Sequence, residues 1–293
     1  MIVNSYIIDQ LEEFKRLTEK NKSSHWKTRL KNDNYSSSIY LNLGFGSFEK
    51  KTYIKSIFHY IFLRFLFGFK IFKSQEAVAY KNIFEKMNRQ LDLDALRHIF
   101  TFNKLKYKNH PKKICIIGDG KANFVLGCLK IFPETPIYSI NLTEVLIHDY
   151  LIISKHNFIK DSETQVVSNR NDLKNTNKKL FLIPSSNKNL LYDSEIELFV
   201  NIASFQEMTI EEINSYFKII KSNNAKLYAC NREKKILSGG EVLKFDDYPW
   251  GKGVKIFQEN CPWHQKYYSF RPNFIHKYDG NIMHCLIDYS VKN

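Results

Sequence analysis

After about residue 110, short apolar segments alternate with helix-like segments, and this alternation constrains the fold of the 293-residue chain most. The strand-like pieces include ICIIG, PIYSINL, KLFLIPS, IELFVNIAS and AKLYACN, and amphipathic pieces such as TIEEINSYFKIIK lie between them. Strands that alternate with helices form a parallel sheet covered by helices on both faces. We therefore predict an α/β domain with parallel strands at 114–117, 137–140, 197–202 and 226–230.

The residues before this alternation have a helical pattern. Residues 5–21 and 74–100 show helical spacing of apolar residues, and YKNHPKK at 107–113 is typical of a linker. This predicts two parts. Residues 1–110 form a helical N-terminal region that acts as a substrate lid or lies near a membrane, and residues 111–293 form a Rossmann-like α/β domain.

The segment YIKSIFHYIFLRFLFGFKIF, residues 53–72, is strongly apolar but carries Lys55, His59, Arg64 and Lys70. A membrane-spanning helix needs ~20 largely uncharged residues, so this segment is a poor candidate for one. We expect a buried helix here, and the alternative is a helix that lies on the inner membrane surface. The first residues of the chain include acids where a signal peptide needs an apolar core, so we expect no secretion signal.

The net charge is +14, from 44 basic and 30 acidic residues. Such a charge can indicate nucleic acid, an anionic membrane or phosphorylated substrates, but no long basic block occurs, which favours lysines scattered over a solvated surface. The five cysteines are widely separated, and no two lie at zinc-ligand spacing. We expect a cytoplasmic location. Asp246, Asp247 or the late histidines could bind a divalent ion, but no spacing requires it, and we predict no metal.

A glycine turn, Gly118, Asp119 and Gly120, directly follows the first predicted strand. Glycines allow a ligand to approach the main chain, and ligands of open α/β sheets bind at the carboxyl ends of the strands. A P-loop would need a GK[ST] ending, and a nicotinamide-type GxGxxG would need glycine at Asn123. The remaining interpretation is the S-adenosylmethionine turn of a methyltransferase, with Asn141, at the end of the second strand, near the ribose.

Several longer segments point to one family. They are SSHWKTRLKND, LGFGSF, IGDGKANF, NLTEVLIHDYL, FVNIASFQEMTIEEINSYF and ENCPWHQKYYSFRPNFIHKYDGNIMHCLIDY. Together they resemble the bacterial family of sugar O-methyltransferases found among genes for surface polysaccharides. The resemblance covers most of the chain, and the last segment, residues 259–289, is its most specific part. It implies a class I methyltransferase fold, S-adenosylmethionine as cofactor, and a sugar or glycan acceptor that is nucleotide-linked, lipid-linked or polymeric.

The chain departs from the methyltransferase pattern at three positions. Ile116 and Asn141 stand where acids are usual, and Ala122 stands where a third glycine is usual. Asn141 can still accept and donate hydrogen bonds to a ribose, but without the strength that a charge gives. A non-catalytic binding or scaffold protein of glycan assembly is therefore an alternative. A nucleic-acid methyltransferase is a further one, but its usual Asn/Asp-Pro-Pro-aromatic strand end is replaced by NIAS, so we expect no nucleic-acid partner.

Methyl transfer to a sugar hydroxyl needs a general base. Glu207, after a predicted strand end, and His264, among aromatic residues, are the candidates, and His264 is favoured. Asn201 or Ala203 is expected near the methyl end of the cofactor. His276 and His284 flank a Tyr-Asp-Gly turn that we expect inside a C-terminal strand pair. The candidate substrate-binding residues are Trp263, Tyr267, Arg271, His276 and His284.

Overall fold

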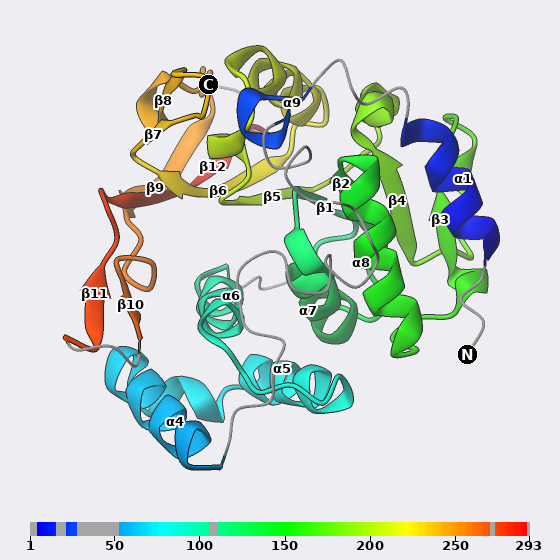
Figure 1. Ribbon diagram of the computed structural model, residues 1–293. Helices are drawn as coiled ribbons and strands as arrows, with labels where there is room; N and C mark the ends of the chain where they lie inside the picture. The colour runs from blue at the N-terminus through cyan, green and yellow to red at the C-terminus, as the bar shows by residue number, and fades with distance from the viewer. Residues whose placement is uncertain (1–4, 16–21, 28–52, 106–109, 270–272, 292–293) are drawn as a thin grey trace.

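The computed structural model describes residues 5–15, 22–27, 53–105, 110–269 and 273–291. Its central sheet has eight strands: β1 (Ile114–Ile117), β2 (Ile137–Asn141), β3 (Thr164–Val166), β4 (Leu180–Pro184), β5 (Leu198–Ile202), β6 (Lys226–Arg232), β9 (Val254–Asn260) and β12 (Ile282–Asp288). Their order is β3-β4-β2-β1-β5-β6-β12-β9 (Figure 1).

Six of these strands are parallel. β1 pairs with β2 and β5, β4 pairs with β2 and β3, and β5 pairs with β6, all in parallel. β12 is antiparallel to both of its neighbours, β6 and β9. The four predicted parallel strands are confirmed, and the fold is the Rossmann-like α/β class that the sequence predicts.

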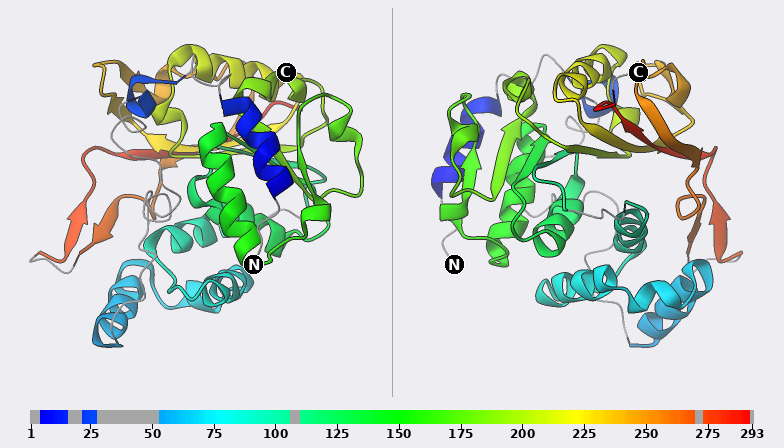
Figure 2. Two further views of the ribbon diagram at one scale, coloured as in Figure 1. Left: turned by 45° about the vertical axis from the view of Figure 1, so that its right-hand side comes forward. Right: turned by 180° about the vertical axis from the view of Figure 1, so that it is seen from behind.

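Helices cover both faces of the sheet because side chains along a buried strand alternate between them. In β1, Ile114 and Ile116 belong to one hydrophobic cluster, and Cys115 and Ile117 belong to the other. The first face is covered by α6 (Leu93–Lys104), α7 (Asn123–Ile131) and α8 (Thr143–Lys155), and the second by α9 (Ile210–Ser222). Figure 2 shows α7 and α9 on opposite sides of the sheet.

The regular elements described before residue 106 are all helical, as predicted. They include α1 (Ser5–Lys15), α4 (Tyr53–Phe67) and α5 (Gln75–Lys86). α1 contacts α8 and β3, whereas α5 contacts α6 and α7. Buried residues of these helices and of the sheet form one continuous hydrophobic cluster. The boundary near residue 110 therefore stays a prediction, because the core continues across it.

α4 is largely exposed, so the expectation of a buried helix is wrong. Within it only His59 and Leu63 are buried, and Tyr53 and Phe65 are 81% and 76% exposed. The apolar composition of the segment predicts burial, but neighbouring elements contact only one narrow side of the helix. In the described part of the chain, no helix has the length and apolarity that crossing a membrane requires.

Two short hairpins accompany the central sheet. β7 (Lys234–Ile236) pairs with β8 (Val242–Lys244), and β10 (Lys266–Tyr268) pairs with β11 (Ile275–Lys277). The predicted C-terminal strand pair around the Tyr-Asp-Gly turn is wrong, because β11 pairs with β10 and β12 pairs with β6 and β9. The reason is burial: most of β12 is buried in the central sheet, whereas β11 is short and partly exposed.

Candidate functional site

A cavity of about 270 Å³ lies at the carboxyl ends of β1, β2, β5 and β6. This volume is near the lower limit, about 300 Å³, of ordinary small-molecule sites. The carboxyl ends of parallel strands are also where open α/β sheets bind their ligands. Six of the predicted site residues line the cavity: Gly118, Asp119, Gly120, Asn141, Glu207 and His264.

The glycine turn has an unusual backbone. Gly118 has a φ of +76°, and a Cβ built on it would overlap the side chain of Ser204. Lys121 and Ala122 have φ values of +68° and +53°, in the left-handed region. A non-glycine residue in this region is strained by about 1–3 kcal/mol, and such strained residues are concentrated at functional sites. A Cβ built on Gly120 meets no atom within 4 Å. The turn is therefore packed tightly at its first glycine and open at its second.

The carboxylate of Asp119 is engaged inside the turn. Its Oδ2 accepts a hydrogen bond from the backbone N–H of Val125, 2.7 Å away, in the first part of α7. Burial raises the pKa of Asp119 to about 7, although backbone hydrogen bonds from Val125 and Phe124 oppose the shift. Burial and the nearby Asp119 also raise the pKa of Asp149 on α8. Asp119 of the turn and Asp149 of α8 are thus both in an environment that disfavours their charged forms.

Asn141 ties the end of β2 to the glycine turn. Its Nδ2 donates to the carbonyl oxygen of Asp119 at 3.0 Å, and its Oδ1 accepts from the N–H of Leu142 at 2.9 Å. An amide NH₂ has two donors, so the second N–H is the group that remains for a ligand. The sequence placed Asn141 correctly at the cavity but did not indicate that its side chain hydrogen-bonds to the backbone.

Asn201, in contrast, does not line the cavity. Its side chain is fully buried, donates to the carbonyl oxygen of Ile117 and accepts from the N–H of Phe205, both at 3.1 Å. The amide of Asn231 also donates to it, at 2.9 Å. This network fixes the backbone where β1, β5 and β6 end. Ala203, the alternative that the sequence offered, does line the cavity.

Residues 22–27 cover part of the cavity, and sequence reasoning did not place them there. Lys22, Ser23 and Trp26 line it. The Oγ of Ser23 donates to the carbonyl oxygen of Glu207 at 2.5 Å. Lys22 forms a buried ion pair with Glu144 of α8, with Nζ and Oε1 2.7 Å apart. The SSHW motif was a signal of family resemblance only, because no local pattern shows which distant surface a segment contacts.

Glu207 lines the cavity. It ends a short 3-10 turn, Phe205–Glu207, that follows β5. Its Oε1 lies 3.7 Å from Nε2 of His25, and its side chain is 15% exposed. An acid of the cavity lining is therefore paired with an imidazole, to which it can pass a proton.

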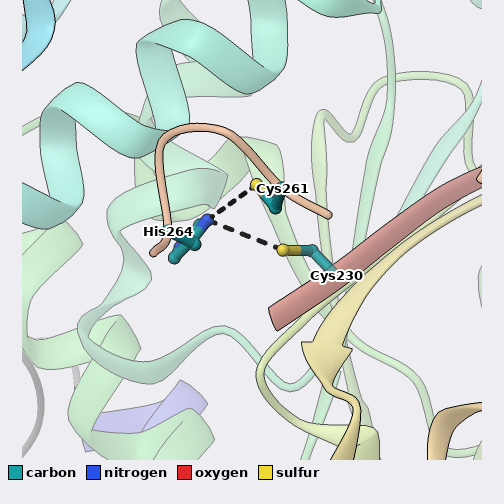
Figure 3. A group of neighbouring side chains, drawn as sticks. All are labelled: Cys230, Cys261 and His264. Carbon is teal, nitrogen blue, oxygen red and sulfur yellow. Dashed lines mark hydrogen bonds between the residues drawn. The ribbon is translucent and has the colours of Figure 1, made fainter. Parts of the chain in front are cut away.

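His264 contacts two cysteines. Its Nδ1 lies 3.2 Å from Sγ of Cys261 and 3.6 Å from Sγ of Cys230, as Figure 3 shows. Burial lowers the pKa of His264 and so favours the neutral imidazole. Burial raises the pKa of the Cys230 thiol. Burial would also raise the pKa of Cys261, but hydrogen bonds from Cys230 and His264 lower it overall.

Arg97 of α6 brings the N-terminal helices to the cavity. It lines the cavity with Asp94 and Tyr278, and donates to Oδ1 of Asp94 at 2.8 Å and to the Tyr278 hydroxyl at 2.5 Å. Its Nε also donates to the carbonyl oxygen of Trp263 at 3.3 Å. No local sequence pattern indicated this group, because its members come from segments far apart in the chain.

Trp263 and His284 lie outside the cavity lining. The ring of Trp263 stacks on Phe100 of α6, with ring centroids 5.5 Å apart. His284 is fully buried, its Nδ1 is 3.2 Å from the Tyr228 hydroxyl, and its Nε2 is 3.3 Å from Oε1 of Glu259. Both side chains pack between the sheet and the helices, so the structure does not place them where a substrate in this cavity would be.

Tyr267 and His276 also lie away from the cavity lining. Their rings stack across the β10–β11 hairpin with centroids 5.0 Å apart. Nε2 of His276 is 2.9 Å from the hydroxyl of Ser269. Arg271 lies outside the described residues, so its predicted role stays a prediction.

The fold and the site define a Rossmann-like α/β protein with a ligand cavity at the strand ends. No family model matches the chain, and no curated protein matches it either. Among solved structures, a SAM-dependent methyltransferase from Aquifex aeolicus aligns with 73% of this chain and 98% of its own, at 9% identity and a TM-score of 0.39. Coclaurine N-methyltransferase, bound to N-methylheliamine and SAH, aligns with 87% of this chain and 77% of its own, at 9% identity and a TM-score of 0.41.

A third structure, the plantazolicin methyltransferase BpumL with SAH, aligns with 81% of this chain and 99% of its own, at 12% identity and a TM-score of 0.38. All three proteins are methyltransferases by name. At such identities and TM-scores they do not identify the family or the substrate of this chain. The resemblance to sugar O-methyltransferases therefore stays a prediction, and function has to be argued from the site.

Proposed function

We propose that the chain is an S-adenosylmethionine-dependent methyltransferase whose cofactor binds in the cavity over the glycine turn. The observation that carries this proposal is the open space above Gly120, at the carboxyl ends of four parallel strands. Two residues of the cavity lining, Asn123 and Ser185, each have a buried side-chain oxygen that lacks a hydrogen-bond partner among the described residues. Buried polar atoms normally have such a partner, and a polar ligand such as a nucleoside could supply it if these side chains turn toward the cavity.

The acceptor that we propose is a sugar hydroxyl. When bound, S-adenosylmethionine supplies a methyl group on a positively charged sulfur, so an O–C bond forms as the S–C bond breaks. Glu207 accepts the hydroxyl proton, because this residue lines the cavity and His25 lies beside its carboxylate. We prefer Glu207 to His264 as the base, since Nδ1 of His264 contacts two cysteine sulfurs.

The resemblance to sugar O-methyltransferases supports a glycan acceptor, which would be nucleotide-linked, lipid-linked or polymeric. The exposed apolar residues of α4 suit contact with a membrane that carries a lipid-linked acceptor. A cytoplasmic location, association with the inner membrane and the absence of a nucleic-acid partner stay predictions. The alternative function is a non-catalytic binding or scaffold protein of glycan assembly.

Isothermal titration calorimetry with S-adenosylmethionine and S-adenosylhomocysteine tests the proposal. We expect the wild-type chain to bind both, and Gly120→Val to lose binding while its thermal unfolding curve stays close to that of the wild type. Gly120→Ala is the matched control, because a single methyl group intrudes less on the ligand. Unchanged affinity in Gly120→Val would place the cofactor elsewhere. A wild-type chain that binds neither compound would favour the scaffold function.

Transfer of a labelled methyl group is then measured with nucleotide sugars and lipid-linked glycans. Methylation of any of these acceptors supports the sugar assignment. Cofactor binding without transfer to any member of such a panel would contradict that assignment, but would leave the methyltransferase proposal intact.

A further inference from the structure

Two thiols and an imidazole meet in the wall of the cavity. Cys230 lies in β6, whereas Cys261 and His264 belong to a Cys-x-x-His turn that follows β9. All three residues are buried, and their Sγ and Nδ1 atoms lie within 4.8 Å of one another. Figure 3 shows the imidazole Nδ1 directed at both sulfurs. The groups that share these hydrogen bonds are also the ligand types that zinc prefers.

The spacing of these atoms is close to that of a zinc site. Zinc binds cysteine sulfur at about 2.3 Å and histidine nitrogen at about 2.0–2.1 Å, so in a tetrahedron sulfur and nitrogen are about 3.6 Å apart. Here Nδ1 lies 3.6 Å from Sγ of Cys230 and 3.2 Å from Sγ of Cys261. In such a tetrahedron the two sulfurs are about 3.8 Å apart, and here they lie within 4.8 Å of each other.

The turn that carries Cys261 and His264 is held rigidly by its surroundings. The N–H of Cys261 donates to the carbonyl oxygen of Ile282 at 2.8 Å. The side chain of Gln265 donates to the carbonyl oxygens of Cys261 and Ile282, both at 2.8 Å. From the other side, Arg97 donates to the carbonyl oxygen of Trp263. Such supporting hydrogen bonds orient metal ligands, so the site is preorganised.

We infer that Cys230, Cys261 and His264 bind one zinc ion, with an open fourth position that faces the cavity. Binding releases the two thiol protons, and a divalent ion with two thiolates and a neutral imidazole has no net charge, which suits a buried position. Thiolates and imidazole select zinc over magnesium or calcium, which prefer oxygen. Three protein ligands with one open position are typical of catalytic zinc, and Cys230 and His264 line the cavity.

This inference rests on the proposed function where it concerns the reaction. The acceptor hydroxyl would be the fourth ligand, and its pKa would fall steeply, as that of zinc-bound water does. Its proton would pass to Glu207, which also lines the cavity. The sequence-based candidate for the base, His264, would then be a metal ligand and Glu207 would be the base.

Metal binding is tested on the full chain without any activity measurement. The protein is purified under reducing conditions, incubated with zinc, dialysed and analysed by inductively coupled plasma mass spectrometry. We expect about one zinc per chain. The chelated protein is also titrated with cobalt, and we expect a thiolate-to-cobalt charge-transfer band together with the visible bands of tetrahedral cobalt. A wild-type chain with neither bound zinc nor the thiolate band overturns the inference, and so does a Cys230–Cys261 disulfide under these conditions.

Variants identify the ligands. Cys230→Ala, Cys261→Ala and His264→Ala should each lose the bound zinc, whereas Cys128→Ala should retain it. Cys128 is a matched control because it is a buried free cysteine of the same hydrophobic cluster. Circular dichroism tests whether each variant is folded. If a variant is unfolded, the cobalt titration of the wild-type chain still tests the inference. Equal loss of zinc in Cys128→Ala would overturn the assignment.

Calorimetry separates this inference from the proposed function. Zinc without any binding of S-adenosylhomocysteine would refute the methyltransferase and keep the metal site. Cofactor binding and methyl transfer that continue undiminished after zinc removal would overturn the role of the metal in the reaction.

Discussion

Replacing Gly118 by alanine would place a methyl group against Ser204 and should destabilise the fold by about 2–5 kcal/mol. The new Cβ would lie 1.8 Å from Oγ and 2.4 Å from Cβ of Ser204, and overpacking of this kind costs about 1–3 kcal/mol. The φ of +76° at Gly118 adds about 1–2 kcal/mol for a residue with a side chain. Their sum is a large part of the ~5–15 kcal/mol by which domains are stable.

A double-mutant cycle with Ser204→Gly separates the two contributions. The Cα of Ser204 would be 3.8 Å from the new Cβ, an ordinary contact, so removing the serine side chain relieves the overlap and leaves the cost of φ. Urea unfolding followed by circular dichroism should give a coupling free energy of about 1–3 kcal/mol between the two substitutions. Gly120→Ala is the control, and we expect it to change stability by no more than about 1 kcal/mol.

Additivity would refute this reasoning. If the effects of Gly118→Ala and Ser204→Gly add to within about 0.5 kcal/mol, the two side chains do not meet. The glycine turn would then differ from the arrangement in which β1 and the end of β5 approach each other, and the placement of the cavity over Gly120 would fail with it.

Three further predictions concern charged groups. Burial raises the pKa of Asp119 to about 7, so this group contributes up to ~4 kcal/mol of stability that is fully present below pH ~4 and is lost as pH rises through 7. Asp119→Asn should therefore flatten this part of the pH dependence of the free energy of unfolding, measured with urea. Equal pH slopes in the variant and the wild type would contradict the prediction. Lys22→Met leaves Glu144 buried and unpaired, so it should lower the free energy of unfolding by ~3–5 kcal/mol in the same assay. Adding Glu144→Gln should restore most of that stability. A loss below ~1 kcal/mol in Lys22→Met would count against the buried ion pair. Glu207→Gln should reduce single-turnover methyl transfer ~100-fold or more without changing cofactor affinity, and full activity would exclude it as the base.

The central strands could be predicted because their signals are local. The apolar run that ends in the glycine turn predicted β1 to the residue, and the rule that parallel strands end at one edge placed Glu207 and Asn141 at a common site. The same rule failed for Asn201, whose position is right but whose amide is used by the backbone. Position along a strand follows from pattern, but the hydrogen-bond partners of a side chain do not.

The contacts that complete the cavity could not be predicted, because they join distant segments. Lys22 and Glu144 are 122 residues apart, and Cys230 and His264 are 34 apart. The search for zinc-ligand spacing considered pairs of cysteines only, so it missed the Cys-x-x-His spacing of Cys261 and His264. The burial of α4 was overestimated for a related reason: apolar composition shows that a helix prefers burial, but only the surrounding fold decides whether a partner is there.

The position of β12 has a consequence for how the chain folds during synthesis. β12 is made after β6 and β9 but lies between them, so in the central sheet β9 has no partner until β12 arrives. Meanwhile β6 presents an unpaired strand edge, which is prone to pairing with other chains. Ile282, at the start of β12, also anchors the turn of Cys261. One wall of the cavity is therefore assembled last, and a nascent chain that has not reached residue 282 has no complete site.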